Sequence, residues 1–369
     1  MNTTTRSRRG FLKKSISGGV ALSAAPAVGL GLSPAAKNQS QQIYKSAPRL
    51  PCTIFMSSDL DEKFEKQLLA ISPQITLLKG KEGVDRHEDL RKADIHFGQI
   101  KPDAFAKAEN LSWVHSVSAG VEHQVYPEFV KSKVVLTNAK GCYAPAIAEH
   151  TIGLLFSLTR RIGAQIRNMK EHKWGGTGEQ IEMRDLTMGI VGFGGIGRQI
   201  ARRARAMDMR IVAADIQGFY QEQLGDICDE MLHVQQGGLT KLLEQSDVVV
   251  SAAPHTPITE GMFGKDQFAQ MKPGAIFINV SRGKLMDTNA LMSALDSGHL
   301  RGAAMDVTNP EPLPNDHPLW DYPNVTITSH TSGRSQYSWE RVQSVFIENV
   351  RRYVYGMEMA NLVDKEAGY

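Results

Sequence analysis

Short apolar runs alternate with amphipathic stretches along most of the chain from Cys52 onward. The first such runs are CTIFM, QITLL, ADIHFGQI, LSWVHSVS and VVLTNA, and the last of them ends near Ala139. Runs of this length, rich in β-branched and aromatic residues and separated by helical patterns, are typical of parallel strands joined by crossover helices. The pattern therefore predicts an α/β unit in this part of the chain.

A long helical stretch and a second series of strands follow. The helical stretch runs from Ala144 to Trp174 and is apolar around Leu154, so we expect it to be buried on more than one side and to bridge domains or subunits. The residues from Ser335 to Gly356 have apolar positions at helical spacing and predict one terminal helix without a strand. Between them lie six further strand-like runs: LTMGIVG, MRIVAAD, DVVVSAA, GAIFINVS, GAAMDV and NVTITSH. Two α/β units in succession are predicted.

The first 36 residues have a different character. SRRGFLKK places paired arginines before Phe-Leu-Lys, and the residues from Ser15 to Ala36 carry no charge. This pattern is typical of a twin-arginine export signal, and Ala25–Ala27 offers an A-x-A cleavage site. Repeated glycine and proline disfavour a membrane-spanning helix here. We expect residues 1–36 to direct export to the periplasm and residues 37–50 to form a polar linker; the alternative is a disordered tail that happens to contain Arg-Arg.

Charge and cysteine content exclude several functional classes. The chain of 369 residues has a net charge of +3, but five positive charges and no acid lie within residues 1–27. Without them the net charge is −2, which does not favour nucleic-acid binding. Cys52, Cys142 and Cys228 are scattered, with no CxxC and no histidine pair at metal-ligand spacing. We expect no disulfide framework and no metal site, although one bridge remains possible in an exported protein.

The sequence GFGGIG contains a dinucleotide-binding pattern in its complete context. Gly192, Gly194 and Gly197 follow the strand-like TMGIV and open the helical stretch RQIARRARAM. The first glycine permits a tight turn, the second lets the pyrophosphate approach the backbone, and the third lets the helix pack on the strand. We expect Gly195 and Ile196 to present helix-start amides to the phosphates.

Asp215 ends the next strand, eighteen residues after Gly197. A carboxylate at this place accepts hydrogen bonds from the adenine ribose hydroxyls and repels a 2′-phosphate, so the predicted cofactor is NAD rather than NADP. The alternative is a structural aspartate that caps a helix.

Three later strands each lead into one polar residue that is suited to chemistry. GAIFINVSRG presents Arg282, GAAMDVTNPEP presents Glu311, and NVTITSH presents His330. Ligands of open parallel sheets bind beyond the carboxyl ends of the strands, and the gaps of one crossover let all three residues meet in one crevice. Each residue taken singly also has a structural explanation, as a surface cation, a loop acid and a histidine in a turn.

With these motifs in order, the sequence resembles the D-isomer-specific 2-hydroxyacid dehydrogenases, which include glyoxylate/hydroxypyruvate reductases and phosphoglycerate dehydrogenases. The resemblance runs from about Pro51 to Gly356. Its motifs are SAGVEH from Ser118, NAKGCYAPAIAEHTIGLL from Asn138, GFGGIG with Asp215, NVSRG from Asn279, DVTNPEPLP from Asp306 and SHTSG from Ser329.

The resemblance implies a role for each matching residue. Arg282 orients the substrate carboxylate and polarises the C2 carbonyl, His330 is the acid/base, and Glu311 holds the imidazolium. The backbone amides of the loop centred on Ala119, Gly120 and Val121 receive the carboxylate. Thr256 and Asn279 are the remaining implied cofactor contacts.

The resemblance also implies a split fold. A flavodoxin-like substrate domain, residues 51–145, is completed by the terminal helix in 334–369, and a Rossmann NAD-binding domain, residues 146–333, is inserted between them. Both are doubly wound parallel sheets, and hinge closure over the crevice excludes water. A homodimer through the helical region near 146–170 is implied as well.

Two positions depart from the family pattern. Ser329 replaces the usual proline before the histidine, which predicts a looser histidine loop. His255 stands where an apolar residue is usual, and we interpret it as structural or rim-lying.

The leading hypothesis is an NAD-dependent enzyme that interconverts a small 2-oxo acid and its D-2-hydroxy acid. One alternative is a non-catalytic NAD-sensing or scaffold protein. Another is an exported dehydrogenase that keeps its dinucleotide and shuttles hydride between two substrates. The sequence does not distinguish which acid is used or which direction the reaction takes.

Overall fold

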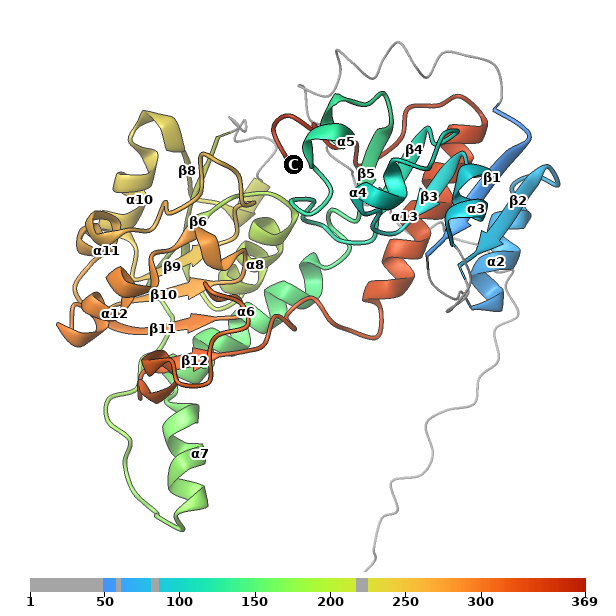
Figure 1. Cartoon of the computed structure of the whole chain (residues 1–369). Helices are drawn as coiled ribbons and strands as arrows, with labels where there is room; N and C mark the ends of the chain where they lie inside the picture. The colour runs from blue at the N-terminus through green and yellow to red at the C-terminus, as the bar shows by residue number, and fades with distance from the viewer. Residues whose placement is uncertain (1–48, 58–60, 81–85, 217–224) are drawn as a thin grey trace, which may run out of the picture. The chain divides into compact units, whose positions relative to one another are not determined.

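The computed structural model describes residues 49–57, 61–80, 86–216 and 225–369, and these form two parallel sheets flanked by helices (Figure 1). The expected export signal, residues 1–36, and the linker as far as residue 48 lie outside the described residues. The fold class expected from the strand and helix pattern, two parallel-sheet α/β domains, is confirmed.

The first sheet has the strand order β2-β1-β3-β4-β5. Its strands are β1 (Cys52–Met56), β2 (Ile75–Lys79), β3 (Ile95–Phe97), β4 (Trp113–Ser116) and β5 (Val135–Asn138). The crossover helices are α2 (Glu62–Leu69), α3 (Arg86–Arg91), α4 (Pro102–Phe105) and α5 (Pro127–Lys131). Helix α2 begins after Asp61, whose carboxylate accepts a hydrogen bond from the Phe64 amide at 2.8 Å.

The terminal helix α13 (Ser338–Val354) packs on this first sheet, although all strands of the second sheet lie between the two in the sequence. Phe346 and Phe97 lie with their ring centroids 4.3 Å apart, and Val342 and Val350 are fully buried in the same core. The apolar positions that predicted the helix are therefore those that bury it.

The second sheet has the strand order β12-β11-β10-β9-β6-β7-β8. Its strands are β6 (Thr187–Val191), β7 (Arg210–Asp215), β8 (Glu230–His233), β9 (Val248–Ser251), β10 (Ala275–Asn279), β11 (Leu300–Met305) and β12 (Val325–Ile327). Strand β8, which the apolar pattern did not predict, is a partly exposed edge strand.

Helices cover both faces of the second sheet. Alternate strand residues belong to different cores, so Ile190 and Ile211 pack on one side while Val191 and Val212 pack on the other. The helices are α8 (Gly195–Arg205), α10 (Gly238–Gln245), α11 (Lys265–Gln270) and α12 (Thr288–Asp296). A doubly wound sheet results.

The long helical stretch after β5 is two helices rather than one. Helix α6 (Ala144–Thr159) packs on α8 and the second sheet, and α7 (Ile162–Lys170) follows. Between them Arg161 adopts the left-handed conformation, with φ of +56°, and its Nε donates to the Thr177 carbonyl at 3.1 Å. A left-handed residue cannot continue an α-helix, so the chain turns here.

All three cysteines are buried thiols outside any disulfide. Burial raises the pKa of Cys52 to about 12, with a further rise from the charge of Asp94, and that of Cys142 to about 11. Within the described ranges, no helix is long and apolar enough to cross a membrane, and no cluster of His, Cys, Asp or Glu is suited to hold a metal ion.

Candidate active site

A crevice of about 700 Å³ lies at the strand ends of both sheets. After β4 and β5 it is lined by Ala119, Gly120, Glu122 and Lys140, and after the strands of the second sheet by the glycine loop, Asp215, His255, Arg282 and His330. This cavity is called the crevice below.

Arg282, Glu311 and His330 follow three strands that are neighbours in the sheet. Strands β10, β11 and β12 lie side by side and parallel, so their carboxyl ends meet at one edge. Arg282 and His330 both line the crevice. Glu311 contacts His330 from the loop after β11. The structure therefore brings these three predicted residues together.

His330 and Glu311 form a close pair. The Nδ1 atom of His330 lies 2.6 Å from Oε1 of Glu311, and about half of each side chain is exposed. A carboxylate at Nδ1 fixes the orientation of the ring. With Nδ1 engaged, Nε2 is the ring nitrogen that can exchange a proton with a ligand in the crevice.

Asp306 holds the histidine loop, and sequence reasoning missed this role. His330 has φ of +52° and donates its amide to the Asp306 carbonyl at 2.8 Å. The buried Asp306 carboxylate accepts the amides of Thr331 and Ser332, each at 3.0 Å, and the Thr328 hydroxyl at 2.6 Å. Burial alone would raise the pKa of Asp306, but these hydrogen bonds outweigh it and hold the pKa below its usual value.

These bonds bear on the looser loop expected from Ser329. A proline before the histidine would restrict the loop by its ring, whereas here the loop is tied on both sides of the histidine to one buried carboxylate. The loop is therefore fixed by hydrogen bonds instead.

Arg282 forms an ion pair with Glu122 across the crevice. Its Nε donates to Oε1 of Glu122 at 2.6 Å, and its Nη1 donates to the Ser281 carbonyl at 2.7 Å. Burial opposes ionisation of Glu122, but the charge and hydrogen bond of Arg282 prevail and lower its pKa. Glu122 belongs to the SAGVEH motif, which was recognised in the sequence, but its ion pair with Arg282 was not predicted.

The backbone loop before Glu122 approaches Arg282 closely. A Cβ atom on Gly120 would lie 2.0 Å from Nη2 of Arg282, so a larger residue here would displace the guanidinium from its position beside the loop. Asn138 holds the loop by donating Nδ2 to the Ala119 carbonyl at 2.6 Å. Ala119 and Gly120 line the crevice, whereas Val121 is buried in the core of the first sheet.

The glycine loop joins β6 to α8 as the motif predicts. Gly192 has φ of +93°, and a Cβ there would lie 2.5 Å from the Ala253 amide nitrogen. A Cβ on Gly197 would lie 2.2 Å from the Gly192 carbonyl oxygen, which fits a glycine needed for close helix–strand packing. Gly192, Gly194, Gly195 and Ile196 line the crevice, and Gly197 is buried behind them.

Asp215 lies at the end of β7 and also lines the crevice. Its Oδ2 accepts the Phe193 amide at 2.7 Å, so the carboxylate supports the glycine loop as well as facing the cavity. Lys140 lies near enough to feel its charge: burial lowers the pKa of Lys140, and Asp215 opposes that shift. Among the described residues at this end of the crevice, the carboxylate of Asp215 and the ammonium group of Lys140 therefore lie near each other.

Thr256 and Asn279 occupy supporting positions, and the described lining of the crevice does not include them. Asn279 is fully buried, accepts the Ser281 amide at 3.1 Å, and donates to the Arg282 carbonyl at 3.0 Å, which shapes the turn that presents Arg282. The buried Thr256 donates its amide to the Thr259 hydroxyl at 2.8 Å. His255 does line the crevice, with Nε2 3.4 Å from Oε2 of Glu260.

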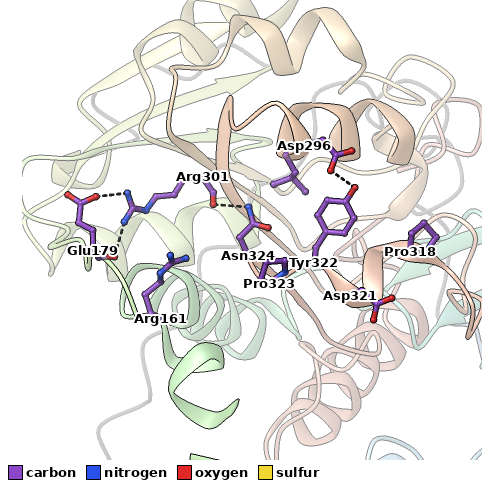
Figure 2. Close-up of a pocket in the computed structure, with 10 residues that line it drawn as sticks. Arg161, Glu179, Asp296, Arg301, Pro318, Asp321, Tyr322, Pro323 and Asn324 are labelled. Carbon is purple, nitrogen blue, oxygen red and sulfur yellow. Dashed lines mark hydrogen bonds and ion pairs between the residues drawn. The ribbon is translucent and has the colours of Figure 1, made fainter. Parts of the chain in front are cut away.

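A second hollow, of about 880 Å³, lies on the second sheet's side near the α6–α7 junction and shares no described lining residue with the crevice. Figure 2 shows its wall, where Arg301 pairs with Glu179 at 2.9 Å and accepts the Asn324 amide on its carbonyl at 3.1 Å. Tyr322 donates to Asp296 at 2.8 Å in the same wall (Figure 2). Among the charged side chains drawn, Arg301 and Glu179 form an ion pair, whereas Arg161 and Asp321 are joined to none of the other residues drawn (Figure 2).

The chain has sequence similarity to a known protein family and to several of its members. The family described as D-isomer specific 2-hydroxyacid dehydrogenase, NAD binding domain, matches residues 152–332. A glyoxylate reductase of Thermofilum pendens is 32% identical over 275 residues, which cover 73% of this chain and 79% of that protein.

Solved structures of similar proteins cover both sheets. A D-isomer specific 2-hydroxyacid dehydrogenase family protein from Aeromonas salmonicida has a TM-score of 0.75 at 30% identity and covers 85% of this chain and 99% of its own. An NADPH-dependent glyoxylate/hydroxypyruvate reductase from Sinorhizobium meliloti, in complex with NADP and sulfate, has a TM-score of 0.73 at 26% identity, covering 86% and 100%.

Proposed function

Since the chain belongs to the family of D-isomer-specific 2-hydroxyacid dehydrogenases, we propose that it is an oxidoreductase interconverting a small 2-oxo acid and its D-2-hydroxy acid. One observation carries the proposal: a guanidinium, a carboxylate and an imidazole follow three successive strands of one sheet, and the guanidinium and the carboxylate-paired imidazole line the same crevice as the glycine loop.

The crevice fits a nicotinamide dinucleotide. Gly194 has no atom within 4 Å of the place where a Cβ would stand, so the backbone at the start of α8 is open to a ligand in the crevice. When bound, the dinucleotide supplies or accepts the hydride at C2 of the substrate.

In the reductive direction, the protein's own groups act on the oxo acid. Arg282 and the amides of Ala119 and Gly120 hold the carboxylate, and Arg282 also draws electron density toward the carbonyl oxygen. As hydride reaches C2, the protonated His330 gives its Nε2 proton to that oxygen, and Glu311 stabilises the imidazolium before transfer. Oxidation runs through the same steps in reverse, with His330 accepting the proton.

We propose NAD as the preferred dinucleotide. Asp215 places a carboxylate where the adenine ribose is expected, and a 2′-phosphate would meet its negative charge. Lys140 works against this preference, so the discrimination is finite. Asp215→Ser should reduce the NADH-to-NADPH ratio of kcat/KM by roughly tenfold or more, and an unchanged ratio would remove Asp215 from this role.

The activity is tested by NADH oxidation with glyoxylate, hydroxypyruvate and pyruvate. The proposal expects turnover of at least one of them by the wild-type protein and little by Arg282→Ala. Tight NADH binding without turnover of any acid would favour the non-catalytic sensor or scaffold instead.

We propose that the protein is a homodimer formed through the helical region 146–170. Helix α7 exposes Ile162, Ile166 and Met169, and Trp174 after it is fully exposed, which is unusual for large apolar side chains so close together. Light scattering should give twice the protomer mass for the wild type and the protomer mass for Ile166→Glu. A monomeric wild type would contradict the assignment.

We further propose export by the twin-arginine route to the periplasm, on the pattern SRRGFLKK. Replacement of both Arg8 and Arg9 by lysine should retain the protein in the cytoplasm, and continued export of that variant would contradict the route.

An exported dehydrogenase that folds first can carry its dinucleotide out and shuttle hydride between two substrates. The dinucleotide should then co-purify with the mature protein.

A further inference from the structure

The chain after α13 returns to the first sheet as an added edge. The Asn138 amide donates to the Asn361 carbonyl at 3.1 Å, and the Val363 amide donates to the Leu136 carbonyl at 2.9 Å. Thr137 and Leu362 form an antiparallel bridge between them. This pairing fixes the direction in which the following residues leave the sheet.

The next six residues, Asp364–Tyr369, form a closed turn that we call the tail clasp. The Gly368 amide donates to the Asp364 carbonyl at 2.8 Å, and the Asp364 amide donates to Tyr369 O at 3.1 Å. Inside the turn, Oδ1 of Asp364 accepts the amides of Glu366 and Ala367, each at 3.0 Å. The turn is therefore a defined structure with its own hydrogen bonds.

Lys365 anchors the tail clasp to the end of α5. Its Nζ donates to three carbonyl oxygens, those of Phe129 at 3.2 Å, Ser132 at 2.7 Å and Val134 at 3.0 Å. A lysine that satisfies the carbonyls at a helix end is a strong local anchor. The tail clasp is therefore anchored to the segment between α5 and β5 of the first sheet.

The clasp brings Gly368 and Tyr369 into the wall of the crevice, together with Asp215 and Ile216 from the end of β7. Tyr369 is partly buried there. Burial raises its pKa, and the negative charges of Asp215 and Asp364 raise it further, which places the phenol near Asp215. An aromatic side chain that is anchored to the first sheet thus lies at the end of the crevice where Asp215 and the glycine loop of the second sheet are found.

We propose that the tail clasp is part of the dinucleotide site, with Tyr369 forming the outer wall of the adenosine pocket opposite Asp215 and slowing release of the cofactor. This inference rests on the proposed function only in taking the crevice as the dinucleotide site. The aromatic ring supplies apolar surface to the adenosine half, and the cofactor leaves only when this wall moves away. The glycine loop holds the phosphates, and the clasp holds the end beyond them.

The test compares NADH binding and release among full-length variants. Tyr369→Ala should raise the dissociation constant of NADH about tenfold, chiefly through a faster dissociation rate, as expected for loss of one aromatic face against a base. Tyr369→Phe keeps the ring and should stay near the wild type. Tyr355→Ala is the matched control, because Tyr355 is 55% exposed on the end of α13 and lies outside the lining of the crevice.

Binding of ADP-ribose, which lacks the nicotinamide, shows whether the tail clasp acts at the adenosine end of the dinucleotide. Because the clasp acts at the adenosine end, Tyr369→Ala should weaken ADP-ribose by the same factor as NADH. A chain ending at Val363 should show at least the loss seen with Tyr369→Ala, which covers the case that a single substitution is compensated by its neighbours.

The outcomes separate this inference from the proposed function. If the wild type binds and oxidises NADH while Tyr369→Ala and the shortened chain release it at the wild-type rate, the clasp assignment is overturned and the enzyme stands. If either variant binds NADH more tightly, the segment obstructs the site instead, and the assignment is likewise overturned. A wild type that binds no dinucleotide would refute both.

Discussion

The two sheets share one architecture but have different interiors. In the second sheet, β6, β9 and β10 are buried along their whole length, and buried polar side chains gather at strand ends and loops, as at Ser251, Asn279 and Asp306. In the first sheet, polar groups lie within the strands themselves. Trp113 and His115 both hydrogen-bond the Thr137 hydroxyl, at 2.8 and 2.7 Å.

This difference assigns different tasks to the two halves. Apolar packing in the second sheet leaves its polar groups where they shape the loops that carry Arg282 and His330. The first sheet keeps two neutral histidines in its core, His96 and His115, whose pKa values burial lowers to about 4 and about 3. We therefore expect catalysis to depend most on the second sheet and acid stability to depend most on the first.

The largest effect should come from His330. His330→Gln removes the proton donor and should lower kcat about 10²- to 10⁴-fold, with little change in the free energy of unfolding because half of the side chain is exposed. Steady-state kinetics and denaturant unfolding measure the two. The control is His172→Asn, since His172 is exposed and asparagine tolerates its φ of +56°. A His330→Gln enzyme with wild-type kcat would move the acid/base elsewhere.

The next effect should be a loss of stability in acid. Because the folded pKa values of His96 and His115 lie below the unfolded value of 6.5, only the unfolded chain gains protons as the pH falls below 6.5. The contribution of these histidines to the free energy of unfolding should thus be constant above that pH and fall by about 2 kcal/mol per histidine between pH 6.5 and about pH 5. Denaturant titrations across this range measure it.

His115→Phe sharpens this test. Phenylalanine suits the ring cluster around Phe97 and Phe346 and carries no proton, so about half of the pH dependence should disappear. An unchanged dependence would place the acid-sensitive groups outside the first sheet.

A smaller effect is expected from Asp306→Asn. Asparagine has one acceptor oxygen in place of two, so it cannot keep all the hydrogen bonds that the carboxylate accepts from Thr328, Thr331 and Ser332, and the histidine loop should be held less firmly. We expect kcat to fall by roughly 10- to 100-fold with the KM for NADH unchanged. A changed KM for NADH with an unchanged kcat would contradict a role in positioning His330.

The smallest effect should come from Glu122→Gln, on the first sheet's side. The carboxylate competes with an anionic substrate for Arg282, so its neutralisation should lower the KM for the oxo acid by about threefold, as for a partly exposed ion pair. Initial rates over a range of oxo-acid concentrations measure this. A higher KM would instead show that Glu122 orients Arg282 for binding.

Much of this arrangement could be predicted from the sequence. In the part of the chain that the structure describes, apolar runs identified every strand except β8, whose edge position leaves it partly exposed. The order of the strands at their carboxyl ends brought Arg282, Glu311 and His330 together. The break at Arg161 escaped prediction because a single left-handed residue leaves no apolar signal.

Contacts between residues that are far apart in the sequence could not be predicted. Asp306 and Glu122 bind groups that are distant in the sequence, and Tyr369 lies in the same crevice as such groups, and no local periodicity relates them. The terminal stretch was predicted as a helix alone, whereas its last residues line the crevice. Such pairings are set by tertiary packing rather than by local pattern.

The configuration of the product tests the central claim most directly. Wild-type protein, NADH and hydroxypyruvate or pyruvate should yield the D-2-hydroxy acid alone, and Arg282→Ala and His330→Gln should yield almost none. Formation of the L isomer, or equal yields from these variants and the wild type, would contradict hydride transfer in the crevice between Arg282 and His330.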